Sequence, residues 1–142
     1  MTLADPVPWL LLAAAAHLGF QLTVDLVVYP ALAEVGPDRW TSAHAGHSRR
    51  ITPVVALVYV PLVLVLGWAG VAEPGEVGTW VAVAGGLLSV VATAAVAAPI
   101  HGRLSSVDPD ERSVLLGRLA RADRVRTVGA VVCVVGAVLL VG

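Results

Sequence analysis

The sequence has no lysine, only one cysteine and few charged residues of any kind. Charged side chains make up 13% of the 142 residues, whereas a soluble domain carries about 25%, so an ordinary soluble domain is excluded. The single Cys133 excludes an internal disulfide and a cysteine-rich metal site, and its apolar neighbours predict a buried, inert thiol. Phosphate-binding loops, dinucleotide fingerprints, the HExxH zinc motif and the nucleophile elbow are missing, and no nucleic-acid partner is expected.

Long apolar runs take up most of the chain. Hydrophobic residues make up 58% of it, with a mean hydropathy of +0.87. Four runs, at about 8–29, 51–72, 77–100 and 125–141, approach the roughly 20 residues that cross a bilayer, the last being slightly short. Because only helices satisfy their own backbone within one such segment, the sequence predicts an all-α membrane protein. It would form a single four-transmembrane-helix bundle over residues 1–142, with an uncleaved first span.

The arginines are confined to two connections and their helix edges. The N-terminal tail, the middle loop and the C-terminal end have none. The positive-inside rule therefore predicts both Arg-rich connections in the cytoplasm and both termini outside, in a bacterial-type plasma membrane. Trp9, Trp68 and Trp80 lie at the opposite ends of the first three spans, as an outer aromatic belt would. The arginines are Arg39, Arg49, Arg50, Arg103, Arg112, Arg118, Arg121, Arg124 and Arg126.

Two helices are predicted to begin before they enter the membrane. Gly36–Pro37 places proline at the first helical position, so the second helix is expected to start at about residue 37. Asp108–Pro109 is a second start, with Glu111 three residues after the capping aspartate. The segment from about 109 to 124 either lies on the inner membrane surface or extends the last helix, and the sequence does not choose between these.

Three polar residues share one face of the first span. His17, Gln21 and Asp25 are spaced i, i+4 and i+8. Because ionisable groups are costly in a span, they usually face the bundle interior, so we expect a polar band there that widens toward the cytoplasm. We take these three as candidate catalytic residues, with Asp25 and Gln21 relaying protons or orienting a ligating histidine. The alternative is a hydrogen-bond network that fixes helix packing.

Three histidines are predicted to meet at the cytoplasmic mouth of that band. His44 and His47 point the same way on a helix, and His101 lies at a matching depth after the third span. Histidine is the commonest metal ligand, so these three are the candidate ligands for copper or iron. The alternative is that polar side chains collect there because the membrane interface is wet.

Four short motifs resemble the small four-span proteins of the anthrone-oxygenase-like family. They are "VVYP", "HAGHSRRI", "PIHGRL" and "LARADRVRT". Members with an assigned role oxidise polycyclic anthrones to quinones. The resemblance implies four spans and a site at the cytoplasmic mouth that includes Asp123, and we take Asp123, Arg126 and Tyr29 as candidate cofactor-binding residues. At the positions of His101 and Asp123 the family more typically has asparagine.

These observations lead to one hypothesis and two alternatives. The first is a membrane-embedded oxidoreductase, oxygenase-like, which acts on a small lipophilic substrate that enters from the lipid bilayer. The second is a heme-binding membrane protein with two of the histidines as axial ligands. The third is a non-enzymatic small transporter or assembly subunit that uses the polar band as a proton or solute path. Helix faces rich in small residues also suggest a homodimer.

Overall fold

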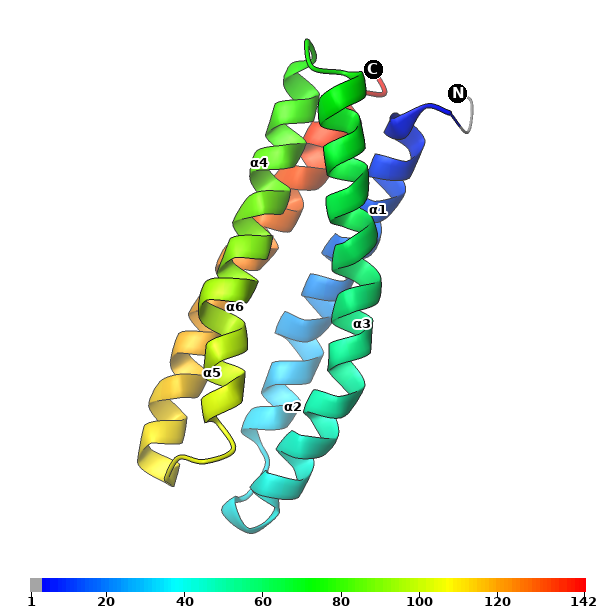
Figure 1. The fold of residues 1–142 in the computed structure, drawn as a ribbon. Coiled ribbons are helices and arrows are strands. Elements are labelled where there is room, and N and C mark those ends of the chain that lie inside the picture. The colour runs from blue at the N-terminus through cyan, green and yellow to red at the C-terminus, as the bar shows by residue number, and fades with distance from the viewer. Residues whose placement is uncertain (1–3) are drawn as a thin grey trace.

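The computed structural model describes residues 4–142, which form four long helical rods joined by short connections (Figure 1). Each rod runs antiparallel to the next along the chain. The first rod consists of α1 (Pro6–Thr23), the π-helical η1 (Val24–Val28) and α2 (Tyr29–Ala33). The second is α3 (Pro37–Ala72), the third joins α4 (Val77–Ala92), the π-helical η2 (Thr93–Ala97) and α5 (Ala98–Arg103), and the fourth is α6 (Pro109–Leu139).

The rods have the length and the surface of membrane-spanning helices. The first three are long and apolar enough to cross a bilayer. The fourth is less apolar, because its last 18 residues include Asp123, Arg124 and Arg126. Large hydrophobic side chains cover the outside of the bundle, as at Leu57 and Val71, where lipid would surround them. The chain is therefore a helical-bundle membrane protein, and the predicted count of four helices agrees with the structure.

Side chains at the helix starts explain where the rods begin. Asp5 caps α1, with its Oδ1 accepting a hydrogen bond from the Val7 N–H at 2.9 Å. Asp108 caps α6 in the same way, accepting from the Glu111 N–H at 2.9 Å. From there α6 runs unbroken to Leu139, so the segment 109–124 is an extension of the last helix and not a separate surface helix.

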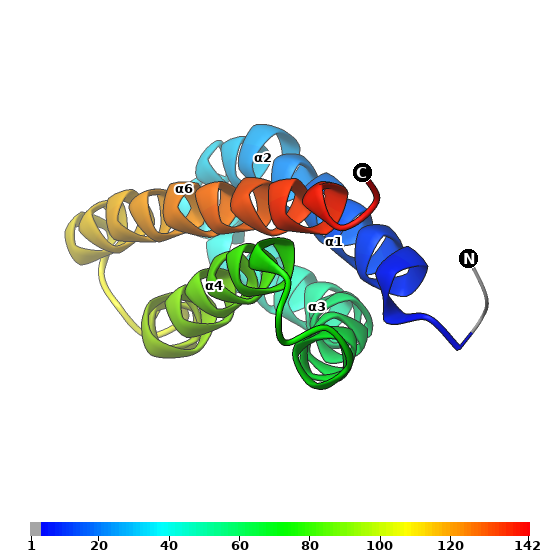
Figure 2. The same cartoon turned by 90° about the horizontal axis from the view of Figure 1, so that it is seen from above.

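The two helical hairpins, α1–α3 and α4–α6, share a local plan. In each, the descending rod contains a five-residue π segment, η1 or η2, followed by a proline at the second residue of the next helix, Pro30 or Pro99. The returning rod then begins with proline and aspartate, at 37–38 and 109–110. Viewed from above, α6 lies between the first rod and α4 (Figure 2), and it contacts both π segments.

Glycines bring α4 and α6 into close contact. A Cβ added to Gly78 would lie 2.7 Å from the carbonyl oxygen of Gly136, and one added to Gly129 would lie 2.7 Å from that of Gly85. The two backbones therefore touch at positions where any larger residue would collide, which is how small residues join helices in membranes. This contact fixes the C-terminal part of α6, from Gly129 to Gly136, against α4.

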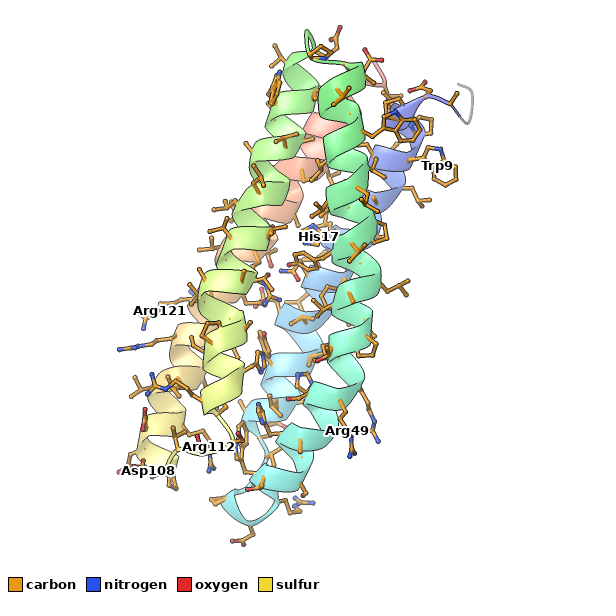
Figure 3. The ribbon with its side chains drawn as sticks, in the orientation of Figure 1. Trp9, His17, Arg49, Asp108, Arg112 and Arg121 are labelled. Atoms are coloured by element: carbon orange, nitrogen blue, oxygen red, sulfur yellow. The ribbon has the colours of Figure 1, made fainter. Side chains whose placement is uncertain are left out.

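Apolar packing divides the bundle into two ends. Figure 3 shows Trp9 near one end, here called the tryptophan end, and Arg49, Asp108 and Arg112 toward the other, here called the arginine end. The apolar cluster of the tryptophan end consists of Leu10, Ala14, Leu62, Leu66, Ala69, Ala82, Cys133 and Ala137. The cluster of the arginine end consists of Leu32, Trp40, Ala97, Ile100, Leu104, Leu115 and Leu119. Buried polar side chains lie between the two clusters.

Candidate functional site

The three predicted histidines come together, and they do so as a stack of rings. His44 on α3 stacks on His101 of α5, with ring centroids 5.8 Å apart and 16° between the planes. His47 stacks on the same His101, at 5.9 Å and 30°. Trp40 extends the stack behind His44, at 5.4 Å and 16°, and the Arg112 guanidinium lies 4.7 Å above its ring. The HxxH motif and His101 therefore belong to one aromatic cluster.

The stacked arrangement differs from that of a preformed metal centre. Within residues 4–142, no group of three His, Cys, Asp or Glu side chains could hold a metal ion. Metal ligation needs the ring nitrogens to point at a common centre, whereas the three imidazoles present their faces to one another. The residues predicted as metal ligands thus lie side by side as stacked rings, and their binding of copper or iron stays a prediction.

Tyr29 and His101 form a polar pair between the first and third rods. The Tyr29 Oη lies 3.3 Å from the His101 Nε2, and their ring centroids are 6.1 Å apart. Tyr29 follows η1 directly, and His101 lies in α5, shortly after η2. The two π segments therefore come just before the residues that meet here, which agrees with the frequent occurrence of π segments at functional sites.

A buried ion pair within α6 is hydrogen-bonded to the first rod. The Arg126 Nη2 lies 2.8 Å from the Asp123 Oδ1, and Asp123 is fully buried. The same Nη2 donates a hydrogen bond to the Gln21 Oε1 at 3.1 Å, and the Asp25 carboxyl lies close enough to that of Asp123 to interact with its charge. On the opposite side, Ser89 donates to the Arg126 carbonyl oxygen at 2.7 Å. This network draws together the predicted residues Gln21, Asp25, Asp123 and Arg126.

His17 belongs to a second polar cluster nearer the tryptophan end. Its ring makes an edge-on contact with Tyr59 of α3, with centroids 4.8 Å apart. The Tyr59 hydroxyl lies 3.0 Å from the Thr93 Oγ1, which in turn donates to the Ser89 carbonyl oxygen at 2.8 Å. Neither ring nitrogen of His17 has a hydrogen-bond partner among the described side chains, although the residue is fully buried. His17 is therefore held by packing.

A cavity of about 290 Å³ opens among the first three rods, next to these groups. Its polar lining comes from Tyr29, His47, Ser48, Thr52, Thr93, His101 and Arg126. Its apolar lining comes from Phe20, Val24, Ile51, Val55, Ala97 and Ala98. The cavity thus combines apolar walls with a few hydrogen-bonding groups, which is the usual make-up of small-molecule sites.

The sequence pointed to most of these residues but not to all. Tyr59 was not among the candidates, nor was Trp40, which lies one helical turn before His44 and donates a hydrogen bond from its Nε1 to the Leu104 carbonyl oxygen at 2.9 Å. That one-turn spacing on a shared helix face was the available signal for Trp40. Of the candidates, His44, Asp25, Gln21, Asp123 and His17 do not line the cavity.

Comparison with protein-family models, with curated proteins and with solved structures gives no match. The resemblance to the anthrone-oxygenase-like family therefore still depends on the four motifs alone. Any functional assignment has to come from the cavity and the polar groups around it.

Proposed function

We propose that this protein is a membrane-embedded oxidoreductase, oxygenase-like, that acts on a small lipophilic substrate in the cavity beside Tyr29 and His101. The observation that carries the proposal is the cavity of about 290 Å³, in which apolar walls lead to the Tyr29–His101 pair and to Arg126. A cavity of this composition suits a molecule that is mostly apolar and carries a few polar atoms.

The position of the cavity favours entry from the lipid. From Trp80, Thr93 lies about 20 Å along the rod and His101 about 31 Å, at about 1.5 Å per residue. The hydrocarbon core is about 30 Å thick, so the cavity extends from within the hydrocarbon region to its boundary. We further propose that this boundary is the cytoplasmic one, with both termini outside a bacterial plasma membrane, because the arginines gather at this end.

Tyr29 and His101 supply proton transfer in the proposed reaction. The net reaction converts a substrate CH₂ group and dioxygen into a carbonyl group and water. Both C–H bonds break, one oxygen atom enters the carbonyl group and the other leaves in water, so that no further reductant is needed. In this scheme the His101 Nε2–H donates to the Tyr29 hydroxyl, 3.3 Å away, which holds the imidazole in place, and the other ring nitrogen, Nδ1, accepts the substrate proton.

The buried ion pair would position Arg126 at the wall of the cavity. Arg126 lines the cavity with only 5% of its surface exposed, while Asp123 and Gln21 hold its Nη2. A guanidinium fixed in this way presents positive charge to an oxygen of the substrate without first having to rearrange. Asp25, beside Asp123, completes the charged network behind it.

The apolar tryptophan end favours an enzyme over a transporter. The hydrogen-bonded polar groups extend from the cavity through Thr93 to Tyr59, which packs against His17. Beyond His17 the described core is mainly the apolar cluster around Leu10, Leu62 and Leu66, and its one buried polar side chain, Thr79, has no hydrogen-bond partner that would continue the path. A polar path that stops halfway gives access from one side only, as a binding site needs and a transport path does not.

Dioxygen uptake by the purified protein in lipid nanodiscs tests the proposal, with anthrone as the probe. We expect uptake and the absorbance of the quinone product in the wild type. His101→Gln should lower kcat about 100-fold or more, the usual size of a lost general base. Tyr29→Phe should lower it less, and Arg49→Gln, an exposed change on α3, should leave it unchanged.

Two results would contradict the proposal. One is a wild-type protein that binds no anthrone and takes up no dioxygen. The other is turnover that survives His101→Gln. A Soret band in the purified protein would instead favour the heme-binding alternative, and stoichiometric copper or iron that is lost in His47→Ala would require a metal in the scheme.

A further inference from the structure

A second, shallow groove lies on the outside of the bundle, between η2 with its flanking turn and α6. It has a volume of about 310 Å³ and an apolar floor made by Ala92, Val96, Ala122 and Val125. Arg118 and Arg121 border it from α6, one helical turn apart. The groove is separate from the cavity described above, and it shares no lining residue with that cavity.

The two arginines of the groove have no acidic partner among residues 4–142. Asp123 is buried and paired with Arg126, and Glu111 pairs with Arg103. The Arg121 Nε makes only a long hydrogen bond of 3.4 Å to the Gly117 carbonyl oxygen. Figure 3 shows the Arg121 side chain extending away from the helices. The positive charge of this surface is therefore not compensated from within the described chain.

The groove lies at a depth where such charge needs a partner. Its floor residue Val96 is about 24 Å along the rod from Trp80, inside a hydrocarbon core of about 30 Å. Arginine at this depth extends its guanidinium toward the headgroups. A phosphate is the anion that membrane lipids offer there, and the planar guanidinium binds it through two parallel hydrogen bonds.

We propose that this groove is a binding site for one anionic glycerophospholipid. Arg118 and Arg121 bind its phosphate, and an acyl chain lies on the floor formed by the alanines and valines. The small side chains Ala92 and Ala122 leave room for the chain. The groove contains no carboxylate that would pair with the ammonium group of a zwitterionic lipid, so a net negative headgroup is favoured.

Thermal unfolding in detergent with added lipid tests this site. We expect phosphatidylglycerol to raise the Tm of the wild type by about 5 °C or more above the effect of phosphatidylcholine, because a ligand of the folded state stabilises it. The double variant Arg118→Gln/Arg121→Gln should lose this difference. The matched control Arg49→Gln/Arg50→Gln removes two exposed, adjacent arginines at the same end of the bundle, away from the groove, and should keep it.

A third variant tests the apolar floor of the groove separately from the charge of the two arginines. Val96→Trp keeps both arginines and fills the apolar floor, and it should reduce the preference for phosphatidylglycerol as well. The proposal is overturned if the arginine double variant keeps the full preference, if the control loses as much of it, or if the two lipids stabilise the wild type equally. It is also overturned if inorganic phosphate reproduces the shift, because the site would then bind a free anion.

Discussion

The two ends of the bundle use the same four helices in different ways. Toward the tryptophan end, glycines of α4 and α6 bring the backbones into contact, and the core is an apolar cluster with Leu10 and Leu62 fully buried. Toward the arginine end, the first and third rods pass through π segments, and the interior holds an ion pair, a stack of histidines and a cavity. One end is built to hold the helices together, and the other to keep polar groups and open space inside.

The difference indicates where stability and function reside. Apolar side chains gain little from leaving lipid, so close packing has to supply the association energy in a membrane. The tryptophan end has such packing, and this lets the other end include buried groups that reduce stability, such as the Nε2 of His44, unpartnered among the described residues. Substitutions in the two ends should therefore differ in size and in kind.

The largest effect is expected when one member of the buried ion pair is removed. Asp123→Leu leaves the Arg126 charge with only Gln21 beside its Nη2, and breaking a buried pair costs about 3–5 kcal/mol. The double variant Asp123→Leu/Arg126→Met removes both charges and should recover most of the loss. Unfolding in detergent measures both. A single variant that is as stable as the double one would mean that the pair does not stabilise the fold.

The next largest effect is expected at the glycine contact of the tryptophan end. A Cβ on Gly85 would collide with the backbone of α6 at Cys133 and Gly129, so Gly85→Ala should cost about 1–3 kcal/mol through overpacking. Gly67→Ala is the matched control, because nothing lies within 4 Å of a Cβ at that position. Equal unfolding midpoints for the two variants would show that α4 and α6 are not held by this contact.

Much of the fold could be predicted, because hydropathy and helix capping act locally. The apolar runs lie within a few residues of the rod ends, except that α3 and α6 begin well before their apolar runs, at 37 and 109, where Gly36–Pro37 and Asp108–Pro109 predict helix starts. Two expectations remain predictions: that both termini lie outside, and that the membrane is a bacterial plasma membrane. The structure adds the π segments, which no local pattern indicated. Each shifts the following residues around the helix axis. Val24, three residues after Gln21, is more deeply buried than Asp25, four residues after it, because both positions share the inner face.

The candidate site was predicted as a set of residues but not as an arrangement. Depth along a helix follows from counting residues, and this was enough to bring His44 and His47 next to His101. The orientation of an imidazole ring depends on the side chains packed against it, here Trp40. Spacing alone could not distinguish a stack from a set of ligands. The partner of Arg126 on another helix, Gln21, was equally beyond a local pattern.

A smaller effect is expected from replacing the central ring of the stack. His44 is buried between Trp40 and His101, and its Nε2 has no hydrogen-bond partner among residues 4–142. His44→Phe keeps an aromatic ring of similar size and should change the free energy of unfolding by less than about 1.5 kcal/mol. His44→Ala, which leaves a hole in the stack, should cost more. If the phenylalanine variant unfolded as readily as the alanine variant, a polar role for His44, such as ligation, would have to replace stacking.

The smallest effect is expected at the exposed ion pair of the arginine end. Arg103 and Glu111 form a salt bridge across the connection to α6, and their side chains are 59% and 41% exposed. Solvent and salt screen such a pair, so Glu111→Gln should cost about 0.5 kcal/mol or less, and less still at high salt. The variant keeps the Glu111 N–H that Asp108 caps, whereas Asp108→Ala removes the cap and should cost about 1 kcal/mol. The free energy of unfolding measured at low and at high salt separates the loss of the salt bridge from the loss of the helix cap. A loss at Glu111 as large as that at Asp123 would show that exposed and buried ion pairs stabilise this bundle equally, and that burial does not set the contribution of an ion pair at the arginine end.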